Sequence, residues 1–272
     1  MSTPRAYTRA FSSLGCVELT FDEILALALN YGLDAVELRG LDGSLDIPAC
    51  LAQAYDSPEA FADHTRRSCV RVISFDTSLR LIGNTPADRH AFLQFIPWAE
   101  ALGVPRLRIF DGGRKTLTDE DLAEALDTLV WWNSLRREKG WRTDLMIEAH
   151  DALVSTPAIR SFLAAAPSGT SLLWDAHHTW RKGGETFADT WGAIRDTVVH
   201  IHVKDSVTIL SGGHPYAYVL PGQGEFPMSA LLDILRRDSF TGPVSFEWER
   251  LWHPELPSLR DALTSASNNH WW

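Results

Sequence analysis

The sequence predicts an α/β protein folded as a single (β/α)8 TIM barrel, in which parallel strands alternate with helices. Three observations lead to this fold class. The chain has 272 residues, and barrels of this kind form one domain from roughly 250 residues. Short β-branched segments alternate with longer segments of helical periodicity, and this unit recurs eight times. An open doubly wound sheet would usually have fewer strands and a glycine-rich nucleotide loop, so we expect one barrel domain over residues 1–272.

The first helix has the clearest signature of the predicted elements. Thr20 and Glu23 in "TFDE" form a capping box, an apolar stripe follows, and Gly32 ends the helix. The strands are expected at about residues 10–14, 34–39, 70–75, 106–110, 144–148, 171–175, 198–204 and 243–247. Further helices are expected at about residues 58–68, 86–103, 118–138, 156–165, 185–195, 228–238 and 256–267.

Composition and charge narrow the range of partners. The formal net charge is −10 and no run of Lys and Arg occurs, which argues against a nucleic-acid partner. The N-terminal segment lacks the apolar core of a secretory signal, and no segment resembles a membrane span. Three cysteines without metal-type spacing argue against a disulfide framework. We therefore expect a cytoplasmic protein with no membrane partner.

Polar side chains recur on one face of the predicted strands. Residues two apart share a face of a strand, so His200, His202 and Lys204 lie opposite an apolar face in the segment "HIHVKDS". The same division occurs in five other strands, whose polar faces carry Glu37 and Arg39, Arg106 and Arg108, Glu148 and His150, Asp175, and Glu247 and Glu249. Active sites of such barrels form at the C-terminal ends of the strands, so these groups are expected to converge there.

Four of these side chains have the chemistry of a metal site. Glu148, Asp175, His202 and Glu247 supply oxygen and nitrogen ligands without thiolates, which suits one divalent ion such as Mn, Mg, Co or Zn. Glu148 and Asp175 are 27 positions apart, as are Asp175 and His202, close to the roughly 30 residues of one βα repeat. For any single residue a solvated strand end or an ion pair is the alternative interpretation, but the repetition favours a shared site.

At these residues the sequence resembles the xylose-isomerase-like TIM barrel superfamily, which contains sugar isomerases and epimerases, inosose dehydratases and AP-endonuclease-type nucleases. Four motifs carry the resemblance in order, together with "YGLDAVELR" on the second strand: "IEAH" at 147–150, "WDAHH" at 174–178, "HIHVKD" at 200–205 and "SFEWE" at 245–249. The resemblance spans most of the chain.

The resemblance implies roles for individual residues. Glu148 and Glu247 resemble the pair that serves both as metal ligands and as catalytic acid and base in the epimerases. His178, which follows the ligand aspartate by three positions, is implied to contact substrate rather than metal. Lys204 and Glu37 match a lysine and an inward glutamate of the family, and both are expected to bind substrate.

The implied activity is that of a metal-dependent isomerase or epimerase of a small polyhydroxy ketone or aldehyde. Proton transfer next to the carbonyl would proceed through a metal-stabilised enediolate. The near alternative is an inosose-dehydratase-like lyase. An AP-endonuclease-type phosphodiesterase is a more distant alternative, because the third and fourth strands contain no histidine.

Two positions depart from the ketose 3-epimerases of the family. A second glutamate and an arginine are found there at the positions that Val154 and Thr208 occupy here, which argues against a free ketohexose 3-epimerase.

Three further features leave alternatives open. Arg108 could bind a substrate carboxylate or phosphate through its forked donors, or form an ion pair with Glu37 or Glu148. In "LPGQGEFP" the glycines Gly222 and Gly224 are expected to form a tight turn near the mouth, with a phosphate cradle as the alternative. Trp271 and Trp272 are expected to form an exposed tail that either docks on a neighbouring surface or subunit or is disordered, so a homo-oligomer stays open.

Overall fold

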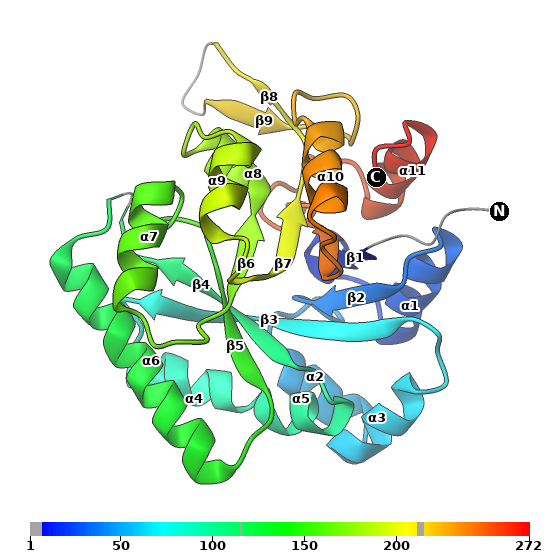
Figure 1. Ribbon diagram of the computed structural model, residues 1–272. Helices are drawn as coiled ribbons and strands as arrows, with labels where there is room; N and C mark the ends of the chain where they lie inside the picture. The colour runs from blue at the N-terminus through cyan, green and yellow to red at the C-terminus, as the bar shows by residue number, and fades with distance from the viewer. Residues whose placement is uncertain (1–6, 115, 211–214) are drawn as a thin grey trace.

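The computed structural model describes residues 7–114, 116–210 and 215–272. In this part of the chain eight parallel strands close into a barrel in the order β1-β2-β3-β4-β5-β6-β7-β10, and β10 pairs with β1 (Figure 1). The strands are β1 (Thr8–Ser12), β2 (Ala35–Leu38), β3 (Arg71–Ile82), β4 (Arg106–Gly112), β5 (Asp144–Glu148), β6 (Leu172–Asp175), β7 (Val198–Val203) and β10 (Pro243–Phe246). The predicted (β/α)8 barrel is confirmed.

Helices lie between the strands and cover the outside of the barrel (Figure 1). They are η1 (Ser13–Cys16), α1 (Phe21–Asn30), α2 (Ile47–Ala54), α3 (Pro58–Thr65), α4 (Pro86–Leu93), α5 (Ile96–Leu102), α6 (Asp119–Lys139), α7 (Thr156–Ala165), α8 (Ala176–Arg181), α9 (Phe187–Ile194), α10 (Met228–Arg237) and α11 (Leu259–Asn268). The predicted capping box of α1 is present, because Thr20 Oγ1 accepts from the Glu23 N–H and Glu23 accepts from the Thr20 N–H.

The helical layer differs from the prediction at η1 and α2, neither of which was expected, and in two further places. The single helix expected at 86–103 is two helices, α4 and α5. Pro97 lies in the first turn of α5 and has no N–H to donate to the preceding turn, so a continuous helix would be interrupted there. The short helix α8 was not predicted. It begins directly after β6, and Asp175 both ends that strand and caps the helix by accepting from the His178 N–H at 2.9 Å.

An unpredicted hairpin follows β7. Strands β8 (Ser206–Thr208) and β9 (Tyr216–Tyr218) pair antiparallel and extend past the end of β7 (Figure 1). Asp205 holds the connection from the hairpin to α10, because its carboxylate accepts from the N–H groups of Gly222, Gly224 and Phe226. The predicted tight turn is present, with Gly222 at φ 84°. The phosphate cradle is contradicted, since both glycine N–H groups already donate to Asp205.

The C-terminal aromatic residues pack on the barrel. Trp271 is only 7% exposed, and its ring contacts those of Phe226 and Phe246 at centroid distances of 6.1 and 5.8 Å. Trp272 is half-buried and also contacts Phe246. The tail is therefore not exposed. Of the alternatives left open, docking on a neighbouring surface is confirmed, because these rings pack on apolar surface at the end of β10. No helix in the described residues has the length and apolar character needed to cross a membrane.

Candidate active site

The four predicted ligands come together at the C-terminal ends of four neighbouring strands. Glu148 ends β5, Asp175 ends β6, His202 lies near the end of β7, and Glu247 directly follows β10. Asp175 and His202 are register partners, and the Glu247 N–H donates to the Val203 carbonyl at 3.1 Å. All four side chains are buried, and one ligand atom from each lies within 4.8 Å of the others. This grouping agrees with the sequence-based expectation.

The donor atoms of this cluster fit a divalent cation. Within the described residues Glu148 Oε1, Asp175 Oδ2 and His202 Nδ1 are buried and have no hydrogen bond. His202 Nδ1 lies 3.3 Å from Glu148 Oε1 and 3.4 Å from Glu247 Oε2. Asp175 Oδ2 lies 2.9 Å from the Lys204 ammonium, but without hydrogen-bond geometry. Buried polar atoms without partners are costly, and hard divalent cations prefer such oxygen and nitrogen donors.

Glu37 and two histidines form the layer beneath the cluster. Glu37 Oε2 lies 2.9 Å from His202 Nε2, and Glu37 Oε1 lies 3.3 Å from His200 Nε2. Burial alone would raise the pKa of Glu37, but the two histidines hold it well below its usual value. A carboxylate can only accept, so Nε2 of His202 carries a proton and Nδ1 faces the cluster. Glu37, predicted to contact substrate, thus lies against the far side of a candidate ligand.

The protonation of His202 is coupled to cation binding. Burial lowers the pKa of His202, but the surrounding carboxylates, led by Glu37 and Glu247, hold it well above its usual value. A proton and a cation would therefore compete for Nδ1. Glu37, His200 and His202 also lie within ligand distance of one another. That second group is the weaker candidate, because Glu37 and His202 are already hydrogen-bonded to each other.

Lys204 lies inside the cluster, fully buried among carboxylates. Its ammonium contacts Glu247 and lies 2.6 Å from Glu249 Oε1 and 2.9 Å from Asp175 Oδ2. Burial lowers the pKa of Lys204, but these three carboxylates hold it well above its usual value. Burial would raise the pKa of Glu247, but Lys204, with His202 and Arg108, holds it well below its usual value. The sequence placed Glu249 on the inward face but gave it no role.

Arg108 forms an ion pair with Glu148, one of the two alternatives that the sequence left open. Its Nε donates to Glu148 Oε2 at 2.6 Å, and its Nη1 donates to the Thr77 carbonyl at 3.1 Å. Burial would raise the pKa of Glu148, but Arg108 and His202 together lower that pKa to about 2. Glu148 is therefore a carboxylate at neutral pH.

His178 and His177 lie at the start of α8, and both are buried. His178 Nδ1 lies 3.1 Å from Asp175 Oδ2, so the residue predicted to contact substrate lies beside a candidate ligand. His177 Nε2 lies 2.8 Å from Ser206 Oγ, beneath the hairpin. Burial, reinforced by the charge of Lys204, holds the pKa of both histidines well below its usual value, so both are neutral.

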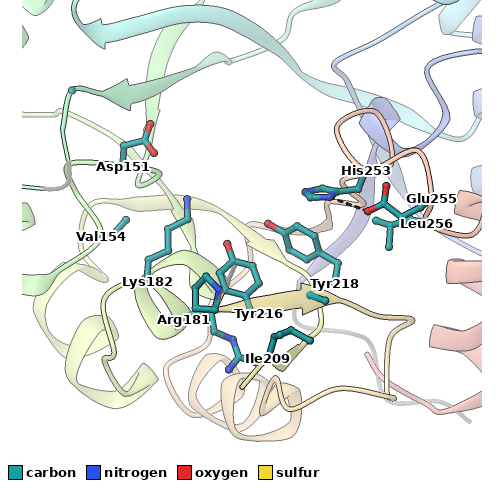
Figure 2. A pocket seen from close by; sticks show the side chains of 13 residues that line it. Asp151, Val154, Arg181, Lys182, Ile209, Tyr216, Tyr218, His253, Glu255 and Leu256 are labelled. Carbon is teal, nitrogen blue, oxygen red and sulfur yellow. Dashed lines mark hydrogen bonds and ion pairs between the residues drawn. The ribbon is translucent and has the colours of Figure 1, made fainter. Parts of the chain in front are cut away.

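A cavity of about 980 Å³ opens over this end of the barrel. Figure 2 shows Tyr216 and Tyr218 of the hairpin on one side, Lys182 and Asp151 on another, and the hydrogen-bonded pair of His253 and Glu255 across from them. Its lining does not include the four clustered ligands. Tyr218 connects the cavity with the buried cluster. Burial and the charge of Glu249 raise the pKa of its hydroxyl, and the charge of Lys204 lowers it. The sequence analysis missed this lining, because the three-residue strands of the hairpin show no detectable periodicity.

Asp76 of β3 is a further buried carboxylate that the sequence analysis missed. It is 1% exposed and accepts from Ser12 Oγ at 3.3 Å and Ser74 Oγ at 3.1 Å. Burial and the nearby charge of Glu37 raise its pKa well above the usual value. The alternation in "VRVISFDTS" could have indicated it, since Ser74 and Asp76 share a face of the strand.

Comparison with known proteins agrees with the fold. The chain belongs to the family described as Xylose isomerase-like TIM barrel, which matches residues 25–266. No curated protein matches the chain.

Several solved structures share the fold. The probable 3-DHS dehydratase AsbF from Bacillus anthracis aligns with a TM-score of 0.73 at 14% identity, covering 96% of this chain and 99% of that one. The IOLI protein with a bound zinc atom aligns with a TM-score of 0.74 at 16% identity, covering 97% of this chain and 96% of that one. A D-tagatose 3-epimerase-like protein aligns at 0.69 and 15%, covering 96% and 95%.

Proposed function

We propose that the protein is a divalent-metal-dependent isomerase or epimerase of a small polyhydroxy ketone or aldehyde. The reaction is proton transfer at the carbon next to the carbonyl. The observation that carries the proposal is the buried cluster of Glu148, Asp175, His202 and Glu247, whose ligand atoms lie within 4.8 Å of one another. Membership of the xylose isomerase-like family and the zinc in one structural neighbour support it.

Glu148, Asp175, His202 and Glu247 would hold the cation. When bound, a divalent cation supplies Lewis acidity, which polarises a carbonyl and lowers the pKa of the neighbouring C–H. Glu148 and Glu247 serve as proton acceptors, because Arg108 and Lys204 keep both of them ionised. Epimerisation needs a carboxylate on each side of the reacting carbon, whereas isomerisation reuses one base. The two glutamates follow β5 and β10, with β6 and β7 between them, which supports approach from two sides.

The remaining polar groups bind and shield the substrate. His178 is neutral and buried beside Asp175, so its ring can exchange hydrogen bonds with a substrate hydroxyl. Lys204 orients Glu247 and Asp175 through its contacts with both. Tyr216 and Tyr218 of the hairpin line the cavity above the cluster and keep water from the reacting carbon.

A dehydratase-like lyase is the second candidate. A structural neighbour is named a probable dehydratase, and loss of a proton next to a carbonyl can be followed by loss of a β-hydroxyl. The two outcomes differ in product, because the lyase forms an unsaturated carbonyl compound and water.

The test is proton exchange in deuterated water. Protein loaded in turn with Mn, Co, Mg or Zn is incubated with a panel of ketoses, aldoses and inososes, and deuterium next to the carbonyl is followed by NMR. We expect exchange with at least one substrate. Glu148→Gln and Glu247→Gln should each slow it by about 10²–10⁴-fold, the usual contribution of a general acid or base. An unsaturated product absorbing in the ultraviolet would select the lyase.

The matched control is Glu138→Gln, which removes an exposed carboxylate at the far end of α6 and should leave the rate unchanged. Metal content of each variant is measured at the same time. Undiminished exchange by Glu148→Gln at full metal occupancy would contradict the proposed role.

A further inference from the structure

Arg39 is a mostly buried cation whose guanidinium has no hydrogen-bond or ion-pair partner among the described residues. It directly follows β2 and is 8% exposed. Its backbone N–H donates to Ser13 Oγ. Among residues 7–114, 116–210 and 215–272, however, no hydrogen bond or ion pair reaches its guanidinium. The residue is mostly covered, yet none of its guanidinium nitrogens is among the fully buried atoms that lack a partner. Its donors therefore still reach the solvent, where a ligand could meet them.

The position of Arg39 directs it toward the candidate active site. It lies two residues beyond Glu37, whose side chain contacts His202, and residues two apart share a face. Burial lowers the pKa of Arg39 to about 10, and the nearby charge of Arg108 acts in the same direction. The charges of Asp76, Glu247 and Glu148 raise the pKa of Arg39. These are the groups that surround the candidate metal centre.

The backbone around Arg39 is fixed. Ser13 Oγ accepts from the N–H groups of Arg39 and Gly40 at 2.9 and 3.0 Å, and it donates to the Gly40 carbonyl at 2.6 Å. A Cβ on Gly40 would lie 2.6 Å from a methyl carbon of Val17, so the chain passes too close for another residue. The fixed backbone sets where the Arg39 side chain leaves the end of β2.

The carboxylates around Arg39 are committed to other partners. Glu148 pairs with Arg108, and Glu247 pairs with Lys204. Asp76 accepts from two serine hydroxyls, and Glu37 lies against two histidines. The cations within the cluster, Arg108 and Lys204, are therefore paired with carboxylates, and Lys182 at the cavity donates to the His150 carbonyl. Among the described residues, none accepts a hydrogen bond from the Arg39 guanidinium.

We propose that Arg39 binds an anionic group of the substrate, a carboxylate or a phosphate, beside the candidate metal centre. The planar fork of a guanidinium matches both groups through paired hydrogen bonds. This inference rests on the proposed function and narrows its substrate class from neutral sugars to polyhydroxy carbonyl compounds that carry an acid group. It assigns a binding role to a residue outside the four ligands.

The test compares three ligands that share one carbon chain. D-Sorbitol, D-gluconate and D-sorbitol 6-phosphate are titrated into the manganese-loaded protein by calorimetry. We expect at least one anion to bind about tenfold or more tightly than sorbitol. A preference for gluconate identifies a carboxylate substrate, and a preference for the phosphate identifies a phosphorylated one. Arg39→Gln should weaken binding of the preferred anion by roughly 10–100-fold, as for a lost charged hydrogen bond, and change sorbitol less than twofold.

Two further variants keep the test decisive. Arg39→Lys preserves the charge without the fork and should retain part of the preference. Arg67→Gln removes an exposed arginine on the outside of the barrel and should change nothing. Wild-type protein that shows no preference for either anion overturns the proposal, as does an Arg39→Gln variant that weakens sorbitol as much as the anion. Because binding is measured without turnover, loss of this preference and loss of proton exchange are separate results, and each counts against its own proposal.

Discussion

On the side of the barrel mouth formed by β5, β6, β7 and β10, three buried ligand atoms, those of Glu148, Asp175 and His202, lie near one another without hydrogen bonds. On the side formed by β1 to β4, most buried polar groups have partners within the protein. Asp76 accepts from Ser12 and Ser74, and Arg108 donates to Thr77 and Glu148. In the described structure two exceptions on that side are the Arg39 guanidinium and Glu37 Oε1, which has no hydrogen bond but lies 3.3 Å from His200 Nε2. Groups with partners fix the shape of the site, whereas groups without them are the ones to which we assign ligands in our proposals: a cation on the first side and an anion on the second.

The largest expected effect comes from removing the Lys204 ammonium, the positive charge buried on the side formed by β5, β6, β7 and β10. Lys204→Met takes the ammonium away from Asp175, Glu247 and Glu249 and leaves three carboxylates facing one another in a buried space. Breaking a buried ion pair from one partner costs about 3–5 kcal/mol. We expect the metal-free variant to lose about this much free energy of unfolding, measured by urea denaturation. Added manganese should recover part of it, because a cation would again neutralise Asp175 and Glu247.

The control for Lys204→Met is Lys139→Met, which removes an exposed ammonium paired only with Glu138 and should change stability by less than about 0.5 kcal/mol. A loss below about 1 kcal/mol in Lys204→Met would mean that the three carboxylates take up protons instead. Asp175, Glu247 and Glu249 would then be accommodated without any cation.

The sequence predicted the cluster on the first side because each member lies at the end of a strand. A period of two identifies the inward face, and consecutive strands are neighbours in the ring, so Glu148, Asp175 and His202 had to converge. The pairing of the cations was not predictable in the same way. Whether Arg108 contacts Glu148 or Glu37 depends on side-chain reach across the interior, and alternation along one strand contains no information on that distance.

Other features escaped the sequence for a different reason. Strands β8 and β9 have three residues each, too few for a periodic pattern, and α8 begins at the residue after β6. Trp271 follows a polar segment that suggests exposure, yet it is buried against Phe246 of the last strand. The contact between Trp271 and Phe246 depends on tertiary packing, and local composition gives no signal for it.

The next effect tests the cation site itself. His202→Gln removes the imidazole whose Nδ1 faces Glu148 and Glu247. Loss of a residue that only supports a ligand typically costs 10–100-fold in metal affinity, so loss of a ligand should exceed about a hundredfold. Calorimetric titration of manganese into stripped protein measures it. The control is His64→Gln, whose ring contacts Asp22 on the outside of the barrel and should leave affinity unchanged.

The same titration provides a second readout by unfolding. A cation at a hundred times its dissociation constant stabilises the native state by about 2.7 kcal/mol, and this gain should be absent in His202→Gln. Equal affinity of the variant and the wild type would remove His202 from the ligand set and leave its unpaired Nδ1 unexplained.

The smallest effect concerns the residue that joins the two sides. Glu37 lies on β2, on the side with satisfied groups, and contacts Nε2 of a candidate ligand on the other side. Glu37→Gln keeps the shape but loses the charge that fixes the proton on Nε2, so manganese affinity should fall by about 10–100-fold. Glu59→Gln, an exposed change at the start of α3, serves as the control. If Glu37→Gln bound manganese as tightly as the wild type, strand β7 alone would orient His202. The two sides would then act independently, and Glu37 would be free for the substrate contact that the family resemblance implies.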